Sequence, residues 1–326
     1  MNAESSVASA PSRDTKQLHQ IVNRIEENVI KVVLGKQEIA RQCIVALLAG
    51  EHVLLEDVPG VGKTLMGKAI AKSVEGSFCR IQFTPDLLPS DIVGSSIYKS
   101  DTHEFVFNPG PIFNNFVLAD EVNRAPPRTQ SAMLEAMSDG QVSVDGSTHQ
   151  LKPPFMVIAT QNPFEFEGTY VLPESQLDRF LLRVSMGYPD PEFELDILTS
   201  HQKGEPVEEL KAVATVEEIA QIQEAVRQVK VDHSISRYIM SIVHATRNSP
   251  DLSVGVSTRG ALLWYRAVQA MAFCDGRDYV TPDDVKQLAV PVVAHRVKYR
   301  GISQQNQRET LETIVRSILN EVPSPA

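Results

Sequence analysis

The 326-residue sequence has no long hydrophobic run and never reaches the roughly 18 consecutive apolar residues that a membrane-spanning helix needs. Residues 1–17 are polar and rich in Ser and Ala, and they lack the apolar centre of a signal peptide. We therefore expect these residues to form a disordered tail. We also expect no direct membrane insertion, with the cytoplasm as the compartment.

Cysteine is scarce as well. Cys43, Cys79 and Cys274 lie far apart, and no Cys or His cluster in the sequence has the spacing of metal ligands. This pattern excludes a disulfide framework and a Cys/His metal centre. The expected state of the three residues is that of buried, reduced thiols.

Acidic residues outnumber basic ones. The sequence has 41 Asp and Glu but only 31 Lys and Arg, which gives a net charge of −10. Binding to a nucleic-acid backbone needs a basic face, so we expect no nucleic-acid partner. One basic run, made of His295, Arg296, Lys298 and Arg300, interrupts the acidic chain. A solvated helix end is the favoured interpretation of this run, ahead of a local binding patch.

The order of patterns predicts an α/β core followed by a helical region. Up to Pro189, short apolar runs alternate with helical patterns, which indicates a parallel sheet with helices on both faces. Beyond Pro191 the pattern is helical throughout, with helix start signals at Thr215 and Thr281. Three parts are predicted: a tail at 1–17, a core at 18–189 and a smaller all-α domain at 190–326.

The core is predicted to contain five parallel strands and two hairpins. The strands are expected at residues 53–55, 78–83, 116–121, 155–159 and 181–184. The hairpins are expected to pair 96–98 with 104–107, and 141–144 with 148–151.

A strand, a glycine-rich loop and a helix follow one another early in the chain. The run at 53–55 leads through a Pro-Gly turn into Gly62-Lys63-Thr64, which opens a helix. In such a loop Lys63 would reach the β- and γ-phosphates, and Thr64 would offer its hydroxyl to Mg²⁺. Asp57 stands where the full phosphate-loop pattern has its first glycine, and an acid there is unfavourable unless it points away. A chance Gly-Lys-Thr turn is the alternative.

Two acids end the strand at 116–121. The carboxyl ends of parallel strands share one rim, so Asp120 and Glu121 should lie near the phosphate loop. One acid can hold Mg²⁺, and the other can polarise a water for attack on the γ-phosphate. A strand that ends in two solvated acids is the alternative, which the upstream Gly-Lys-Thr makes less favoured.

Three further residues are candidates for the same nucleotide site. Asn162 ends the fourth strand on the same rim and could hold the attacking water, although a turn former before Pro163 is the plainer interpretation. Arg179 precedes the fifth strand, and Arg259 lies in the first turn of a helix in the second region. Each arginine alone fits a surface ion pair. Together they could supply cations to a nucleotide site, one from a neighbour and one from a lid.

These motifs together resemble the MoxR family of AAA+ ATPases. The resemblance is carried by residues 52–64, 116–137, 159–163 and 172–180, and it covers roughly residues 18–320. It implies a AAA+ phosphate-loop core with a helical lid. The stretch Glu-Asp-Val-Pro-Gly-Val-Gly-Lys-Thr resembles a variant common in the family, so nucleotide binding is expected despite the acid at position 57.

The resemblance also implies roles, position by position. Glu121 would be the catalytic base, Asn162 sensor 1, Arg179 a trans-acting arginine finger and Arg259 sensor 2 on the lid. Thr64 and Asp120 would hold Mg²⁺. The segment around Val33 and Gly35 would touch adenine. The residues implied in ATP binding are Val33, Gly35, Pro59, Gly60, Val61, Gly62, Lys63, Thr64 and Leu65.

A trans-acting finger requires a ring, which is usually a hexamer in this family. Such an arginine is worth about 10³–10⁵ in rate, so an isolated subunit should be nearly inactive. The two hairpins match inserts that line the pore of family rings, and family members often work with a von Willebrand A domain protein. The expected function is therefore ATP- and Mg²⁺-dependent, chaperone-like remodelling or maturation of a protein client.

Three other functions are weighed against this one. A nucleotide-gated scaffold that cycles slowly and recruits a partner would use the same site. A DNA-translocating ring is disfavoured by the net charge of −10. A simple phosphate-loop kinase needs no finger, lid arginine or second hairpin, and it is the weakest alternative.

Overall fold

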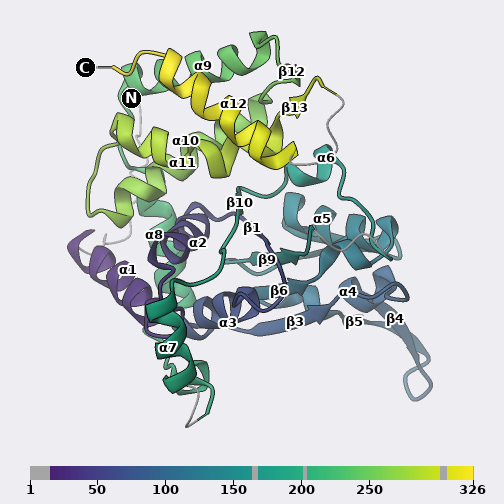
Figure 1. Cartoon of the computed structure of the whole chain (residues 1–326). Helices are drawn as coiled ribbons and strands as arrows, with labels where there is room; N and C mark the ends of the chain where they lie inside the picture. Colours follow the sequence, from purple (N-terminus) through teal and green to yellow (C-terminus); the bar gives the residue numbers. More distant parts are fainter. Residues whose placement is uncertain (1–14, 164–167, 201–203, 302–306, 326) are drawn as a thin grey trace, which may run out of the picture.

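A five-stranded parallel sheet organises the first half of the chain, in the order β10-β1-β9-β6-β3. The computed structural model describes residues 15–163, 168–200, 204–301 and 307–325. Figure 1 shows the sheet below a layer of C-terminal helices. The strands are β1 (Val53–Glu56), β3 (Phe78–Gln82), β6 (Phe116–Asp120), β9 (Met156–Gln161) and β10 (Leu182–Val184). All five expected strands are confirmed, with ends shifted by one or two residues.

Helices cover both faces of this sheet, as expected. One face packs in a core that includes Leu55, Leu118 and Ile158, and the other in a core that includes Leu54 and Val157. Side chains of one strand alternate between the two cores because successive residues point to opposite faces. The helices are α1 (Thr15–Ile30), α2 (Gln37–Ala49) and α3 (Lys63–Ser73) on the first face, with α4 (Pro89–Val93) and α5 (Pro127–Asp139) on the second.

Both expected hairpins are present, and they lie side by side. Phe107 of the first stacks on His149 of the second, with ring centroids 3.9 Å apart. The first hairpin projects from the body at the lower right of Figure 1. It consists of β4 (Gly94–Lys99) and β5 (Glu104–Pro109), and the second of β7 (Gln141–Val144) and β8 (Ser147–Gln150).

Several short elements connect the core. They are β2 (Val74–Glu75), η1 (Pro111–Phe113), η2 (Val122–Arg124) and α6 (Glu174–Leu177). The expected tail at 1–17 falls mainly outside the described residues, and residues 15–17 already belong to α1. The boundary expected after residue 189 stays a prediction.

The C-terminal region is a helical lid, as expected, but it is not helical throughout. It also contains strand segments of two or three residues, which are too short to produce a period-2 pattern in the sequence. One of them pairs with β2 of the core. The strand segments are β11 (Ala214–Thr215), β12 (Leu252–Val254) and β13 (Lys298–Tyr299). The helices are α7 (Pro191–Ser200), η4 (Pro206–Glu209), α8 (Val216–Arg227), α9 (His233–Asn248), α10 (Thr258–Cys274), α11 (Pro282–Val293), η5 (Ala294–Arg296) and α12 (Gln307–Glu321).

The basic run that follows α11 is only half solvated, which corrects part of the sequence interpretation: Lys298 and Arg300 are exposed, whereas His295 and Arg296 are buried. His295 is 3% exposed and Arg296 is 6% exposed. Arg296 is buried because it forms an ion pair with Asp178, which lies 118 residues earlier in the chain. A local charge run gives no sign of such a distant partner.

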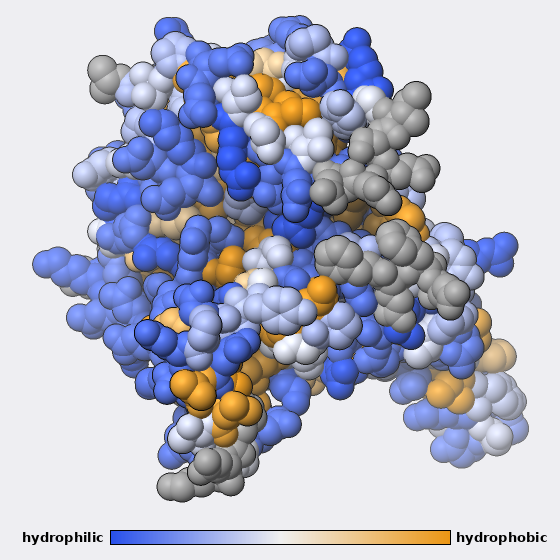
Figure 2. All heavy atoms as spheres, viewed as in Figure 1, coloured by the Kyte–Doolittle hydropathy of each residue, from blue (hydrophilic) through white to orange (hydrophobic). Residues whose placement is uncertain are grey.

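The surface carries two separate apolar patches, seen in orange in Figure 2 at the lower left over α7 and at the lower right over the projecting hairpin. Leu195 and Leu198 of α7 are exposed, and so are Tyr98 and Phe105 of the hairpin. Among the described residues, no helix combines the length and apolarity needed to cross a membrane.

The three cysteines are free thiols. Cys43 and Cys274 are buried, as expected, and burial raises the pKa of each to about 12. Cys79 is only partly buried, since it lies on the edge strand β3.

Candidate functional site

The phosphate loop joins the end of β1 to the start of α3. Gly60 and Gly62 have φ angles of 85° and 93°, in the left-handed region that glycine adopts at least cost. Lys63 is the first residue of α3, and its Nζ donates to the carbonyl oxygens of Gln161, at 3.1 Å, and Asp57. The lysine therefore lies across the carboxyl ends of β1 and β9. Within the loop Pro59 is exposed, Val61 is buried, and Leu65 packs against the core.

Asp57 points away from the position of the phosphates. Its carboxylate accepts hydrogen bonds from the Val58 amide at 2.8 Å, the Ser185 hydroxyl at 2.5 Å and the Gly187 amide at 2.6 Å. Burial alone would raise the pKa of Asp57, but these hydrogen bonds and the charge of Lys63 outweigh it and lower that pKa. Asp57 thus links the phosphate loop to the segment after β10. An acid at this position of the loop is therefore compatible with phosphate binding, because its carboxylate is engaged elsewhere.

Replacing Asp57 with Asn is expected to lower the free energy of unfolding by about 1–3 kcal/mol at pH 7. The reason is that the NH₂ group of Asn cannot accept the hydrogen bonds that the Ser185 hydroxyl and the Gly187 amide donate to Asp57 Oδ2. The pKa of Asp57 is lower in the folded state, so its contribution is present above the unfolded pKa near 4 and lost as the pH falls through the folded pKa. Denaturant unfolding should therefore show a smaller difference between Asp57→Asn and wild type at low pH. An exposed-site control, Asp101→Asn, should show no difference at either pH, and an undiminished Asp57→Asn deficit at low pH would contradict the assignment.

Asp120 and Glu121 lie beside the phosphate loop, as expected for strand ends. Asp120 Oδ2 is 3.4 Å from the Thr64 hydroxyl, and Arg80 Nε donates to the same oxygen at 3.0 Å. Glu121 has a φ of 58°, and Thr160 Oγ1 accepts its amide at 2.9 Å. The Glu121 carboxylate pairs with Arg124 at 2.9 Å. Both acids are thus held by nearby cations.

Thr64 and Asp120 form a suitable donor set for Mg²⁺. A hydroxyl and a carboxylate are hard oxygen donors, and Mg²⁺ is usually bound by one or two carboxylates together with substrate phosphates. Within the described part of the chain, no cluster of three or more His, Cys, Asp and Glu residues could hold a metal ion. The residues present therefore fit an ion that arrives with the nucleotide.

The segment expected to touch adenine lies between α1 and α2. Val33 is 4% exposed. Gly35 has a φ of 71°, and a Cβ there would come within 2.6 Å of the Phe193 ring of α7. Lys36 Nζ donates to the Tyr188 carbonyl at 2.8 Å. The segment after β10 therefore closes against both the phosphate loop and this segment.

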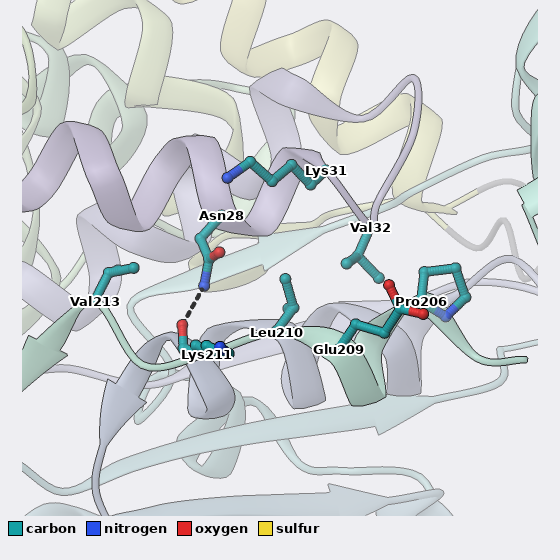
Figure 3. Close-up of a pocket in the computed structure, with 8 residues that line it drawn as sticks. All are labelled: Asn28, Lys31, Val32, Pro206, Glu209, Leu210, Lys211 and Val213. Carbon is teal, nitrogen blue, oxygen red and sulfur yellow. Dashed lines mark hydrogen bonds between the residues drawn. The ribbon is translucent and has the colours of Figure 1, made fainter.

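Figure 3 shows a cavity of about 440 Å³ near this segment, between the end of α1 and η4. Asn28 reaches across it and donates to the Lys211 carbonyl at 3.1 Å. The lining includes Val32 but no residue of the phosphate loop. This cavity is therefore separate from the predicted phosphate site.

Asn162 follows β9 on the same rim as the acids. It is 8% exposed, and its carbonyl accepts Asn123 Nδ2 at 3.2 Å. Its role as sensor 1 stays a prediction.

The two predicted arginines lie at the amino ends of the strands, opposite the rim formed by the carboxyl ends. Leu181 donates its amide to the His52 carbonyl at 2.9 Å, which places the segment containing Arg179 at the amino end of β1. Arg179 Nη1 donates to the Leu134 carbonyl, in the second half of α5, at 2.6 Å. From Glu51 to Asp57, six residues of extended chain span roughly 20 Å. Arg179 therefore lies far from the phosphate loop of its own subunit.

Arg259 lies at this same end of the sheet. Burial raises the pKa of Glu51, and the charges of Arg266 and Arg259 oppose that rise. Burial also lowers the pKa of His52 to about 4, and the charge of Arg259 adds to this effect. Gly260, the next residue, lies against Arg296, because a Cβ there would be 2.8 Å from Arg296 Cδ. Arg296 in turn donates to the Leu181 carbonyl beside the amino end of β1. The role of Arg259 as sensor 2 stays a prediction.

Sequence reasoning missed the residues that hold these groups in place. Arg80, Arg124 and Thr160 surround the two acids, and Gln82 Nε2 donates to Glu121 at 3.0 Å. Arg80 and Gln82 alternate on β3 next to β6, so strand pairing could have suggested them once the sheet order was known. Nothing local in the sequence pointed to Ser185 as a partner of Asp57.

Comparison with known proteins agrees with this geometry. Residues 52–182 match the model of the ATPase family associated with various cellular activities (AAA), and residues 244–318 match the AAA lid domain. The chain is 50% identical over 316 residues to the uncharacterized protein YeaC of Bacillus subtilis, covering 95% of this chain and 97% of that one. It is 39% identical over 323 residues to the chaperone MoxR1 of Mycobacterium tuberculosis, covering 94% and 85%.

The structure is also similar to a crystal structure of a candidate ATPase from Cytophaga hutchinsonii. The TM-score is 0.86 at 36% identity, and the match covers 96% of this chain and 97% of that one. The chain belongs to the MoxR-type AAA ATPases. This family membership implies nucleotide binding.

Proposed function

We propose that this protein hydrolyses ATP in a ring, with each active site completed by the next subunit. Lys63, Thr64, Asp120, Glu121 and Asn162 would act on the nucleotide of their own subunit. Arg179 and Arg259 would act on the nucleotide of the neighbour, and the ring would be a hexamer.

One observation carries this proposal: the phosphate loop and the two arginines lie at opposite edges of the same sheet. A strand rises about 3.3 Å per residue, so the two ends of β1 and its flanking residues are roughly 20 Å apart. Side chains at the amino ends of the strands therefore cannot reach the carboxyl ends. A head-to-tail contact between subunits brings these edges together, and repeated contacts of this kind close into a ring. Both arginines would then face a neighbour's γ-phosphate.

The chemistry needs positioning and charge neutralisation more than covalent intermediates. Glu121 would accept a proton from the attacking water as its oxygen bonds to the γ-phosphorus, and the bond to the β-phosphate oxygen would break to give ADP. Lys63 would leave its carbonyl partners to bind phosphate oxygens. Thr64 and Asp120 would hold Mg²⁺, which would neutralise charge on the β- and γ-phosphates.

The test is the particle mass in solution with and without ATP and Mg²⁺, measured together with phosphate release. We expect nucleotide to drive assembly into a hexamer and the ring to release phosphate. A wild-type protein that stays monomeric at saturating nucleotide and releases no phosphate would contradict the proposal.

We further propose that the ring acts on a protein client through the projecting hairpin. Tyr98 and Phe105 are 49% and 74% exposed, and they face each other across the strands with ring centroids 5.3 Å apart. Exposed aromatic pairs on a projecting element suit contact with apolar segments of another protein. The relative in Mycobacterium tuberculosis is itself named a chaperone. A von Willebrand A domain protein is a candidate partner.

Replacing Phe105 with Ser is expected to abolish the increase in ATP hydrolysis caused by an unfolded protein, such as reduced, carboxymethylated lactalbumin. Basal hydrolysis should stay within about twofold, because the hairpin lies outside the nucleotide site. Phosphate release with and without the unfolded protein measures both rates. The control is Val254→Ser, an apolar position on the lid that is 51% exposed, which should keep the increase. Equal stimulation of both variants would exclude the hairpin as the docking element.

A second function, a nucleotide-gated scaffold that turns over slowly, is favoured by one observation. Lys63 and both acids already have internal partners, so a nucleotide has to displace them. Phosphate release that stays slow in assembled rings, with strong partner recruitment in the ATP-bound state, would favour this function instead.

A further inference from the structure

Arg296 occupies a position that the proposed hydrolysis does not explain. Its side chain is 1% exposed, yet it carries a full guanidinium group. Nε donates to Asp178 Oδ1 at 2.8 Å. A buried arginine of this kind is stable only when its donors are satisfied, and here most of the acceptors come from one short segment.

That segment is residues 178–181, which contains Arg179. Arg296 Nη1 donates to the Leu181 carbonyl at 3.0 Å, and Nη2 donates to the carbonyls of Phe180 and, at 3.3 Å, Asp178. The guanidinium therefore holds the backbone on both sides of Arg179. The direction in which Arg179 leaves the backbone is fixed by these bonds.

The start of α10 packs on the stem of Arg296 and is hydrogen-bonded to the Asp178 partner of the guanidinium. A Cβ on Gly260 would lie 2.8 Å from Arg296 Cδ, so the first turn of α10 packs directly on the arginine stem. Ser257 caps α10, since its hydroxyl accepts the Gly260 amide at 2.9 Å, and it also donates to Asp178 Oδ2 at 3.4 Å. Arg259 lies between these two contacts.

We propose that Arg296 is the positioning residue that fixes Arg179 and Arg259 relative to each other, so that both are presented as one rigid unit to the neighbouring subunit's nucleotide. This inference rests on the proposed function, because it assumes that both arginines act in trans. Arg296 touches no reacting atom in this scheme and acts only through the two segments that it binds.

Replacing Arg296 with Met is expected to lower kcat for ATP hydrolysis about 10²-fold, since a displacement of about 1 Å in a positioned group can cost this much. KM for ATP should change little, because the subunit's own phosphate loop is untouched. Asp178→Asn, which keeps the volume, should lower kcat in the same direction and serves if Arg296→Met does not fold. The matched control is Arg277→Met, which breaks an ion pair with Asp284 elsewhere in the lid and should keep the wild-type kcat.

Mixed rings give a readout that general destabilisation would not produce. A Glu121→Gln subunit has a dead site but intact arginines, so it should serve the intact site of an Arg296→Met neighbour. Random mixing in equal amounts should then restore phosphate release to about a quarter of the wild-type rate, because one interface in four pairs two working halves. An Arg296→Met protein with wild-type kcat, or one whose activity does not rise on mixing, would overturn the inference.

A mixture of Arg179→Ala and Glu121→Gln subunits separates this failure from failure of the proposed function. If that mixture recovers activity and the Arg296→Met mixture does not, only the positioning role is excluded. If neither mixture recovers activity, the trans action of the arginines is excluded as well.

Discussion

Replacing Arg179 with Ala is expected to slow ATP hydrolysis about 10³–10⁵-fold while leaving the ring intact, the range typical of an arginine finger. The physical reason is the proposed action in trans, since Arg179 lies at the amino ends of the strands, away from the phosphate loop of its own subunit. Its side chain now contacts the Leu134 carbonyl and the Ser138 hydroxyl, which anchor it without contributing to the subunit's own nucleotide site. Affinity for ATP should stay within a few-fold of wild type.

The measurement is phosphate release together with particle mass at saturating ATP and Mg²⁺. Arg237→Ala removes an exposed arginine from α9 and should behave like wild type. An Arg179→Ala ring with wild-type turnover would show that the finger lies elsewhere. Loss of the ring itself would show that Arg179 contributes to assembly rather than to the transition state.

Replacing Glu121 with Gln is expected to slow hydrolysis about 10²–10⁴-fold, the contribution typical of a general base. Gln has the same shape, and it can still accept from Gln82 and Arg124, but it cannot take up the proton of the attacking water. ATP binding should persist, because Lys63 and Thr64 are unchanged. The expected product is a ring that holds ATP without cleaving it.

Bound ATP and released phosphate are measured on the same sample. Glu135→Gln, an exposed acid on α5, is the matched control and should turn over normally. Turnover by Glu121→Gln within a few-fold of wild type would mean that another group accepts the proton, and Asp120 would then be the next residue to test.

The central fold could be predicted from the sequence because its signals are local. A buried parallel strand is a continuous apolar run, as at residues 53–55 and 155–159, and its acids or amides mark the carboxyl end. The capping box at Thr215 and Glu218 is confirmed by both of its hydrogen bonds. The phosphate loop, the acids and Asn162 lie on one rim because the strand order places them there, not because they are close in sequence.

What could not be predicted depends on partners far apart in the chain. Asp57 is unfavourable in the loop pattern by itself, and its hydrogen-bond donor Ser185 lies 128 residues later in the chain. Arg296 lies in a basic run that predicts a solvated helix end, and its burial depends on Asp178, which has no local connection to it. The position of Arg259 follows from how α10 packs against α2 and α11, and the amphipathic periodicity of α10 does not specify those partners.

Mixing Arg179→Ala and Glu121→Gln subunits in equal amounts and measuring phosphate release tests whether each site is completed by the next subunit. Each variant alone should be nearly inactive. The mixture is expected to recover about a quarter of the wild-type rate, because an intact site meets an intact arginine at one interface in four. A mixture no more active than the two separate variants, in rings shown by mass to contain both, would contradict the completion of each site by the next subunit.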